Sequence, residues 1–347
     1  MSLPDPTPAR KPRRLGLYIP FGLLLALIVL WSAAWVWARG AALKQMDASV
    51  AELNRAGFDI AWKERDFGGY PFRMDLTLTE AQIREPSGWA LTAPKLEAEA
   101  YLYTPGHWLL AAPAGLTFVR PEKGPVTVTG KLIHASLTHL GQWPPSFSFE
   151  GVGLAFQPGP GAQPFSLSTA DKVEFHLRAG PDDEGGVFTH VDNGKARLSG
   201  LFARIAGDKP ISIVWNATLT KMSAFHGKDW PSAVRKWVAA GGQMRLRQAG
   251  VTAGDALIGS NSGTLTVGAD GRVRGVLDVT LRQAPRALGA LGDQGVIPRE
   301  SARAAAEVAE TRQDSEGAAK ATLNFEAGRT TLGPVAIAPA PKVYDPR

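Results

Sequence analysis

The chain has 347 residues, of which 44% are hydrophobic, and its formal net charge is +6. Four basic residues and one acidic residue in the first 14 positions supply half of that excess, so the rest of the chain lacks the concentrated basic face that nucleic-acid binding requires. The chain contains no cysteine, which excludes disulfides, thiolate metal sites and cysteine nucleophiles.

The first 38 residues divide into a polar tail and an apolar segment. Residues 1–14 combine three early prolines with a basic cluster, so we expect a disordered cytoplasmic tail. Residues 15–38 contain no charged side chain. A helix of this length is about 36 Å long, compared with a hydrocarbon core of roughly 30 Å, so residues 15–38 are predicted to form a transmembrane anchor.

Charge on the two flanks predicts the orientation of this anchor. Four basic residues precede it within five positions, whereas only Arg39 and Lys44 follow at a comparable distance, and this asymmetry keeps the N-terminus in the cytoplasm. Three tryptophans near the outer end suit the headgroup layer, namely Trp31, Trp35 and Trp37. We therefore expect a bacterial inner-membrane protein with the bulk of the chain in the periplasm.

A cleaved signal peptide is the alternative to an anchor. Small residues at Ala33, Ala34 and Ala38 permit cleavage. However, the apolar core of a signal peptide is usually about 7–15 residues long, which is much shorter than this segment. An uncleaved anchor is the favoured interpretation.

Residues 39–57 are predicted to form a stalk helix. Apolar residues recur at helical spacing from Leu43 to Leu53, and Gly57 stands where a helix ends. Because the pattern lasts barely two heptads, we expect this face to pack on the rest of the chain rather than to form a dimeric coiled coil.

From Phe58 onward the hydrophobic period changes to two, which is typical of half-buried strands. We divide this part into a first β-rich region, 58–228, and a second one with helices, 229–335. Predicted strands include 126–137, 187–201 and 243–258. Short breaks between successive strands favour antiparallel pairing. The expected fold is mainly β (α+β), a large antiparallel, curved or sandwich-like sheet with a few helices, preceded by one transmembrane helix.

The second region also carries local signals. A helix is predicted over 230–240, with Asp229 as its N-cap, and further helices over 285–291 and 300–311. The Asp270-Gly271 pair between alternating segments predicts a hairpin. Residues 336–347 are rich in proline and are expected to form a flexible tail.

Several segments carry a resemblance to a known family. They are Gly-Phe-Asp-Ile-Ala-Trp at 57–62, Phe-Gly-Gly-Tyr-Pro-Phe-Arg at 67–73, Gly-Thr-Leu-Thr-Val at 263–267 and Leu-Gly-Pro-Val at 332–335. In these four segments the part after the anchor resembles the uncharacterised alphaproteobacterial family called domain of unknown function 2125. The hairpin near residue 270 is also similar to those of AsmA-like envelope proteins. The resemblance implies an envelope location, a β-rich fold and a link to lipid handling, and it implies no reaction.

Motifs for catalysis are not found. The six histidines form no helical pair with metal-ligand spacing, and the sequence has no Gly-x-Ser-x-Gly elbow, Ser-x-x-Lys or Walker loop. We therefore predict no catalytic residue, no metal and no cofactor, and a non-enzymatic protein. A hydrolase with a scattered site ranks third among the functions considered.

Residues 67–73 are the candidate ligand contact. Phe67, Tyr70 and Phe72 would present rings, and Arg73 would contact an anion such as a phosphate. The competing interpretation is structural, because two glycines and Pro71 suit a tight turn. The structural interpretation is favoured.

Two functions remain in competition. The first is a non-catalytic envelope factor that holds lipid or another apolar ligand against a curved sheet. The second is a structural or assembly scaffold for other envelope proteins. An open apolar groove larger than a few hundred Å² would favour ligand binding, and a closed, packed interior would favour the scaffold.

Overall fold

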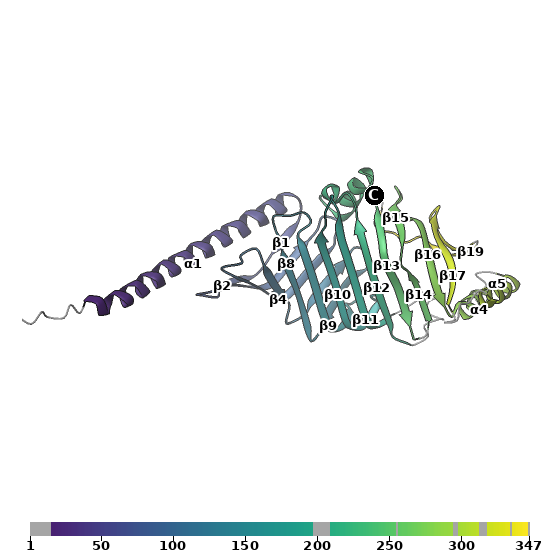
Figure 1. Ribbon diagram of the computed structural model, residues 1–347, viewed down its shortest axis with the longest axis horizontal. Helices are drawn as coiled ribbons and strands as arrows, with labels where there is room; N and C mark the ends of the chain where they lie inside the picture. The colour runs from purple at the N-terminus through teal and green to yellow at the C-terminus, as the bar shows by residue number, and fades with distance from the viewer. Residues whose placement is uncertain are drawn as a thin grey trace, which may run out of the picture.

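The computed structural model describes residues 15–196, 209–254, 256–293, 298–311, 318–333 and 335–345. The tail predicted over 1–14 and the end of the strand predicted over 187–201 lie outside these residues. In the described part, one long helix extends away from one end of a large sheet, and two shorter helices lie near the other end (Figure 1).

Helix α1 (Leu15–Arg55) joins the predicted anchor and stalk into one continuous helix of 41 residues. Within the described ranges it is the one helix that is long and apolar enough to cross a membrane. It ends in a Schellman motif, because the amides of Gly57 and Phe58 bond to the carbonyls of Asn54 and Leu53. Gly57 has a φ of +95°, which a residue without Cβ adopts at little cost, and the chain turns back there.

The remaining helices and the strands follow in chain order. The helices are η1 (Met222–Ala224), α3 (Trp230–Ala239), α4 (Ala284–Asp293) and α5 (Arg299–Thr311). The strands are β1 (Asp59–Ala61), β2 (Glu64–Gly68), β3 (Arg73–Arg84), β4 (Ala90–Tyr101), β5 (Trp108–Ala111), β6 (Leu116–Arg120), β7 (Gly124–Thr129), β8 (Leu132–Thr138), β9 (Ser146–Pro158), β10 (Leu167–Ala179), β11 (Gly185–Ala196), β12 (Ile211–Leu219), β13 (Met244–Ala253), β14 (Ala256–Ser260), β15 (Gly263–Val267), β16 (Val273–Arg282), β17 (Ala318–Glu326), β18 (Arg329–Leu332) and β19 (Val335–Pro339).

Antiparallel pairings join the 19 strands of the described residues into one sheet. Strands β1 and β2 line one edge of β3, and β4 follows β3. Two short pairs, β5 with β8 and β6 with β7, lie between β4 and β9. From β9 the order runs through β10, β11, β12 and β13, then through β14 and β15 beside β16, and ends with β17, β18 and β19. The predicted fold class is confirmed, and because β12 pairs with β13, the two predicted β-rich regions share one sheet.

One face of this sheet is apolar. Residues in direct register across nine neighbouring strands form a single row on this face, and all of them except Thr189 are apolar. We call it the apolar row: Leu76, Ala98, Leu110, Ala135, Phe149, Phe175, Thr189, Trp215 and Ala249. Their neighbours in sequence point to the opposite face and are largely polar. Every member of the apolar row is only partly buried, so the protein leaves this face incompletely covered.

Near the C-terminal end of the sheet, the packing is denser. Helix α3 begins at Asp229, as predicted, and Asp229 and Ser232 form a capping box. Val234 and Trp237 of α3 pack against Tyr344, which is 5% exposed. Residues 336–347 were expected as a flexible tail, but up to residue 345 they form part of β19 and cover α3, because Tyr344 provides an apolar anchor. The helices predicted over 285–291 and 300–311 are present as α4 and α5.

Two predicted strands are each split in the structure. The segment 126–137 is divided between β7 and β8, and 243–258 between β13 and β14. The chain turns at Gly130-Lys131 in the first case and near Gly254, with a φ of +58°, in the second. The hairpin predicted at Asp270-Gly271 connects β15 and β16.

Candidate functional site

A groove of about 980 Å³ lies between α1 and the apolar face of the sheet. We call it the α1 groove. Its walls are mainly apolar, and it is open rather than enclosed. Its volume lies at the upper end of the range for ligand sites, roughly 300–1,000 Å³.

Small side chains form the helical wall of the α1 groove. Ala34, Ala38, Ala41 and Gln45 recur at spacings of three and four, so they lie on one face of α1 and point into the groove. Because alanine extends only one carbon from the backbone, this face leaves space between the helix axis and the sheet. At the N-terminal end of the groove, the wall includes Trp31, which belongs to the apolar part of the helix.

The sheet wall begins with the apolar row. Leu76, Ala98 and Leu110 lie side by side on β3, β4 and β5, and Trp108 and Leu137 continue the wall beside them. Ala98 stands opposite the alanines of α1, so small residues occur on both walls. The groove therefore connects directly with the half-covered apolar face.

The 67–73 segment fastens the first hairpin of the sheet to α1. The indole N–H groups of Trp31 and Trp35 donate to the carbonyls of Pro71 and Arg73 at 2.8 and 2.9 Å. One turn further toward the C-terminal end of α1, the Arg39 guanidinium donates to the carbonyl of Phe67 at 3.4 Å. These side chains recur at i, i+4 and i+8, so one face of α1 carries these three hydrogen bonds.

Two of the predicted contact residues lie at the rim of this junction. The Tyr70 hydroxyl lies 2.8 Å from Ser32 Oγ, and its ring meets the ring of Trp35 edge-on at 5.5 Å. The Phe72 ring lies 6.0 Å from the ring of Trp31. Tyr70 and Phe72 are nevertheless 54% and 58% exposed, so each offers much of its ring to the surroundings.

The other two predicted contact residues are separated. Phe67 is buried in a cluster with Met74 and Ala100 and forms part of the α1 groove wall. Arg73 points to the polar face, where it forms ion pairs with Asp75 at 2.8 Å and Glu99 at 3.3 Å. The structure thus brings Phe67, Tyr70 and Phe72 to α1 and directs the Arg73 side chain away from it.

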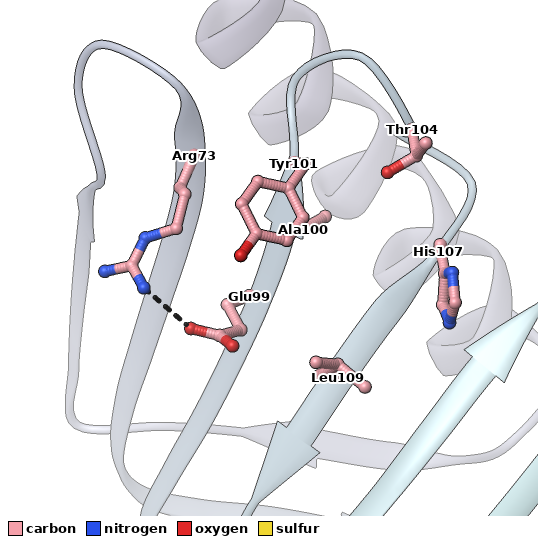
Figure 2. A pocket seen from close by; sticks show the side chains of 7 residues that line it. All are labelled: Arg73, Glu99, Ala100, Tyr101, Thr104, His107 and Leu109. Carbon is pink, nitrogen blue, oxygen red and sulfur yellow. Dashed lines mark hydrogen bonds and ion pairs between the residues drawn. The ribbon is translucent and has the colours of Figure 1, made fainter.

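A small pocket of about 110 Å³ surrounds Arg73 on the polar face (Figure 2). Glu99, Tyr101, Thr104 and His107 line it together with Arg73. Its volume suits a few water molecules, whose share of liquid volume is about 30 Å³ each. Because two carboxylates already compensate the charge of Arg73, the pocket offers an anionic ligand little attraction.

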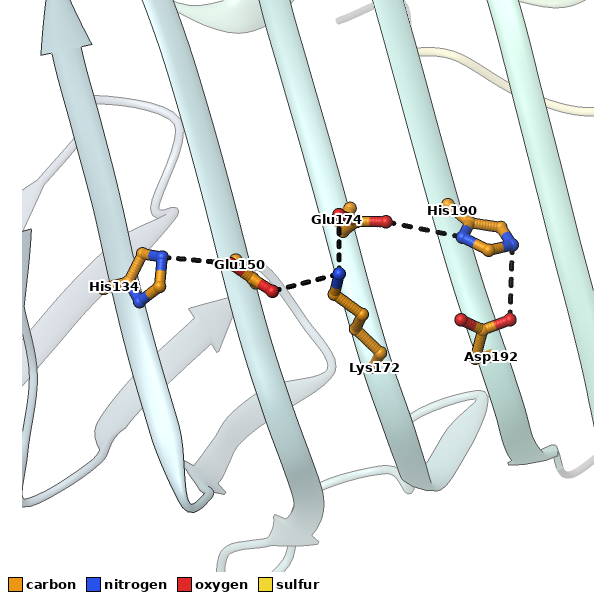
Figure 3. Close-up of polar contacts among 6 residues, drawn as sticks. All are labelled: His134, Glu150, Lys172, Glu174, His190 and Asp192. Atoms are coloured by element: carbon orange, nitrogen blue, oxygen red, sulfur yellow. Dashed lines mark hydrogen bonds and ion pairs between the residues drawn. The ribbon is translucent and has the colours of Figure 1, made fainter.

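A line of charged side chains crosses β8 to β11 on the polar face (Figure 3). Lys172 Nζ lies 3.0 Å from Glu150 and 2.9 Å from Glu174, while His190 lies between Glu174 and Asp192. Hydrogen bonds to Glu174 and Glu150 raise the pKa of Lys172, and the hydrogen bond from Lys172 lowers the pKa of Glu174. Both shifts favour the charged forms, as expected of a surface ion-pair network. Among the described residues no His, Asp and Glu group has the arrangement of a metal site.

Sequence reasoning identified the aromatic rim but not the groove. Ala34, Ala41 and Ala98 carry no chemical signature by themselves, and Leu110 looks like any strand residue. The recurrence of alanine along one face of a long helix is a signal that could have indicated a close approach to another surface.

Together these features define a class of protein in which one helix able to cross a membrane is joined directly to a large, half-covered antiparallel sheet. The chain belongs to the family described as "Uncharacterized protein conserved in bacteria (DUF2125)", whose pattern matches residues 35–341. This confirms the family indicated by the sequence. Comparisons with curated proteins and with solved structures gave no match.

Proposed function

We propose that this chain is a non-catalytic protein of the bacterial cell envelope that holds acyl chains of membrane lipids in the α1 groove. The observation that carries the proposal is the groove itself. It is large, open and apolar, and it begins at Trp31, within the part of α1 that is apolar enough to lie in a bilayer.

The dimensions of the groove suit an acyl chain. Its helical wall extends from Trp31 to Ser49, which is about 27 Å along the helix axis. One leaflet of the hydrocarbon core is about half of the roughly 30 Å total thickness. An acyl chain of a bilayer lipid is therefore shorter than the groove and fits along it.

An uncleaved anchor is part of the proposal. Two of the three alanines that permit signal cleavage, Ala34 and Ala38, line the α1 groove. Removal of the helix up to Ala38 would also remove the donors at Trp31 and Trp35 that hold the 67–73 segment. The proposed topology places the N-terminus in the cytoplasm and the sheet in the periplasm, since the basic cluster precedes the helix.

On the polar face, Glu174 lacks the pKa shift that is typical of a general acid. General acids and bases usually need shifts that bring their pKa toward neutrality, for example a raised pKa for a glutamate. Glu174 shows the opposite shift, because Lys172 holds it in its charged form.

Photo-crosslinking in living bacteria tests this function. A photoreactive phenylalanine analogue replaces either Leu110, which lines the groove, or Leu109, its neighbour on β5 whose side chain points to the polar face. After illumination, the full-length protein is purified and analysed by mass spectrometry for covalently attached lipid. We expect lipid adducts at position 110 that exceed those at position 109 by at least tenfold.

A second pair of variants tests occupancy of the groove. Ala98→Trp places a large ring in the groove, whereas Glu97→Trp places the same ring on the other face of β4. With the photoreactive group at position 110, Ala98→Trp should reduce lipid adducts severalfold and Glu97→Trp should not. Equal labelling at positions 109 and 110, or no lipid at 110, would contradict the proposal and favour a scaffold for other envelope proteins.

A further inference from the structure

The depth of the 67–73 segment relative to a bilayer follows from its contacts with α1. Charged Arg14 immediately precedes the helix and marks the inner boundary of the hydrocarbon core. At 1.5 Å per residue, Trp31 lies about 26 Å and Trp35 about 32 Å beyond it, on either side of an outer boundary at roughly 30 Å. Tilting of the helix would bring both residues deeper into the core.

The same two tryptophans bind the backbone of the 67–73 segment. Since Trp31 donates to Pro71 and Trp35 to Arg73, this part of the loop lies at the depth of the outer boundary. The six residues from Phe67 to Phe72 contain no charged side chain, and the charge of Arg73 is directed toward Asp75 and Glu99. Nothing in this stretch opposes contact with lipid.

The exposed rings have the chemistry of the membrane interface. Tyr70 and Phe72 are more than half exposed, and Trp37 is 76% exposed. Tyrosine and tryptophan are enriched at the level of the headgroups, because their rings are apolar and their polar atoms can stay hydrated. These exposed rings therefore match the surface that α1 brings to them.

We propose that Tyr70 and Phe72 insert into the outer leaflet of the inner membrane and seat the mouth of the α1 groove in it. Trp31 belongs both to this contact and to the groove wall, so the groove opens at the depth where acyl chains begin. A lipid can then move sideways from the leaflet into the groove without exposing its chains to water. This second step rests on the function proposed above, whereas the insertion of the loop does not.

Spin labels measure the depth of the loop. The chain has no cysteine, so Phe72→Cys, Gly68→Cys and Val276→Cys each provide one labelling site. The full chain is reconstituted in vesicles of phosphatidylethanolamine and phosphatidylglycerol, and accessibility of the label to oxygen and to a water-soluble nickel complex is compared. Val276 serves as the aqueous control, because it is 50% exposed on β16, many strands away from α1.

The expected result is a gradient of depth. The label at position 72 should be at least tenfold less accessible to the nickel complex than the label at position 276. The label at position 68 should give an intermediate value, because Arg39 binds the neighbouring Phe67 carbonyl about 38 Å from the inner boundary, in the headgroup layer.

Gly68→Cys protects the test against a folding defect. A Cβ at Gly68 would meet no atom within 4 Å, so this variant leaves the loop intact even if Phe72→Cys does not fold. Nickel accessibility at both loop positions equal to that at position 276 would overturn the insertion. If the loop is inserted but position 110 forms no lipid adduct, the membrane contact stands and the lipid-binding function fails.

Discussion

The two indole N–H groups that hold the 67–73 segment can be removed without removing the aromatic rings. In the double variant Trp31→Phe/Trp35→Phe, apolar rings still face Phe72 and Tyr70, but the carbonyls of Pro71 and Arg73 lose their donors. A hydrogen bond contributes about 0.5–1.5 kcal/mol net, so the two together contribute about 1–3 kcal/mol. At 1.4 kcal/mol per factor of ten, the equilibrium constant for opening, in which the 67–73 segment detaches from α1, rises about 5- to 150-fold.

Hydrogen exchange of the full chain in lipid nanodiscs measures this opening. Amides in the peptide covering residues 67–76 should exchange faster by that factor, while amides of β16 should not change. Trp37→Phe is the matched control, because Trp37 lies on the same helix and is 76% exposed. Unchanged exchange in the double variant, or equal acceleration by Trp37→Phe, would refute the role assigned to the two N–H groups.

Three further outcomes are expected. Asp229→Ala should lower the free energy of unfolding by about 1 kcal/mol, because it removes the cap of α3. Ser232 lowers the pKa of Asp229 in the folded state, so this contribution is present above the ordinary aspartate pKa and is lost as pH falls through the folded-state value. Urea unfolding of the wild type and of Asp229→Ala at several pH values should show that their difference in unfolding free energy shrinks in acid. Gly242→Ala would force a methyl group into the buried ring of Trp237 and should lower the free energy of unfolding by about 1–3 kcal/mol. Gly289→Ala, which has free space around it in α4, should raise the free energy of unfolding by up to about 1 kcal/mol. Thermal unfolding measures both effects. A periplasm-active reporter fused to the C-terminus should be active and a cytoplasm-active one inactive, and the reverse result would contradict the proposed topology.

The overall architecture could be predicted because its signals are local. Alternation such as Val173, Phe175 and Leu177 against Lys172 and Glu174 identifies a half-buried strand without any knowledge of its partners. The apolar segment and the helix stop at Gly57 are equally local, and both are present in α1.

The sequence of the split strands carries a signal for the turn. In 126–137 the apolar positions are even in β7, at Val126 and Val128, but odd in β8, at Ile133, Ala135 and Leu137. A change of phase means that the chain has turned, since one continuous strand keeps its alternation. Gly130 at the change of phase is the residue that marks the turn.

The site depends on contacts that local patterns do not encode. The bonds from Trp31 and Trp35 to the 67–73 segment join residues 40 and 38 positions apart. In the less favoured interpretation of the 67–73 segment, Arg73 would contact an anionic ligand. The register of β3 and β4 places Glu99 beside Arg73, and this pairing can only be known from the sheet. The interpretation of the glycines and Pro71 as a tight turn does not conflict with a role for Tyr70 and Phe72, because the turn is what presents these rings.

The order of strands in the sheet bears on how the protein is assembled. Each strand from β3 onward pairs with at least one strand that precedes it in the chain. Under the topology proposed above, the N-terminal helix leaves the translocation machinery first, and its outer half offers a surface for the first hairpin. The sheet can therefore grow strand by strand away from the membrane while the chain is still emerging. Each new edge is soon covered by the next strand, which limits the time during which an unpaired edge could recruit another chain.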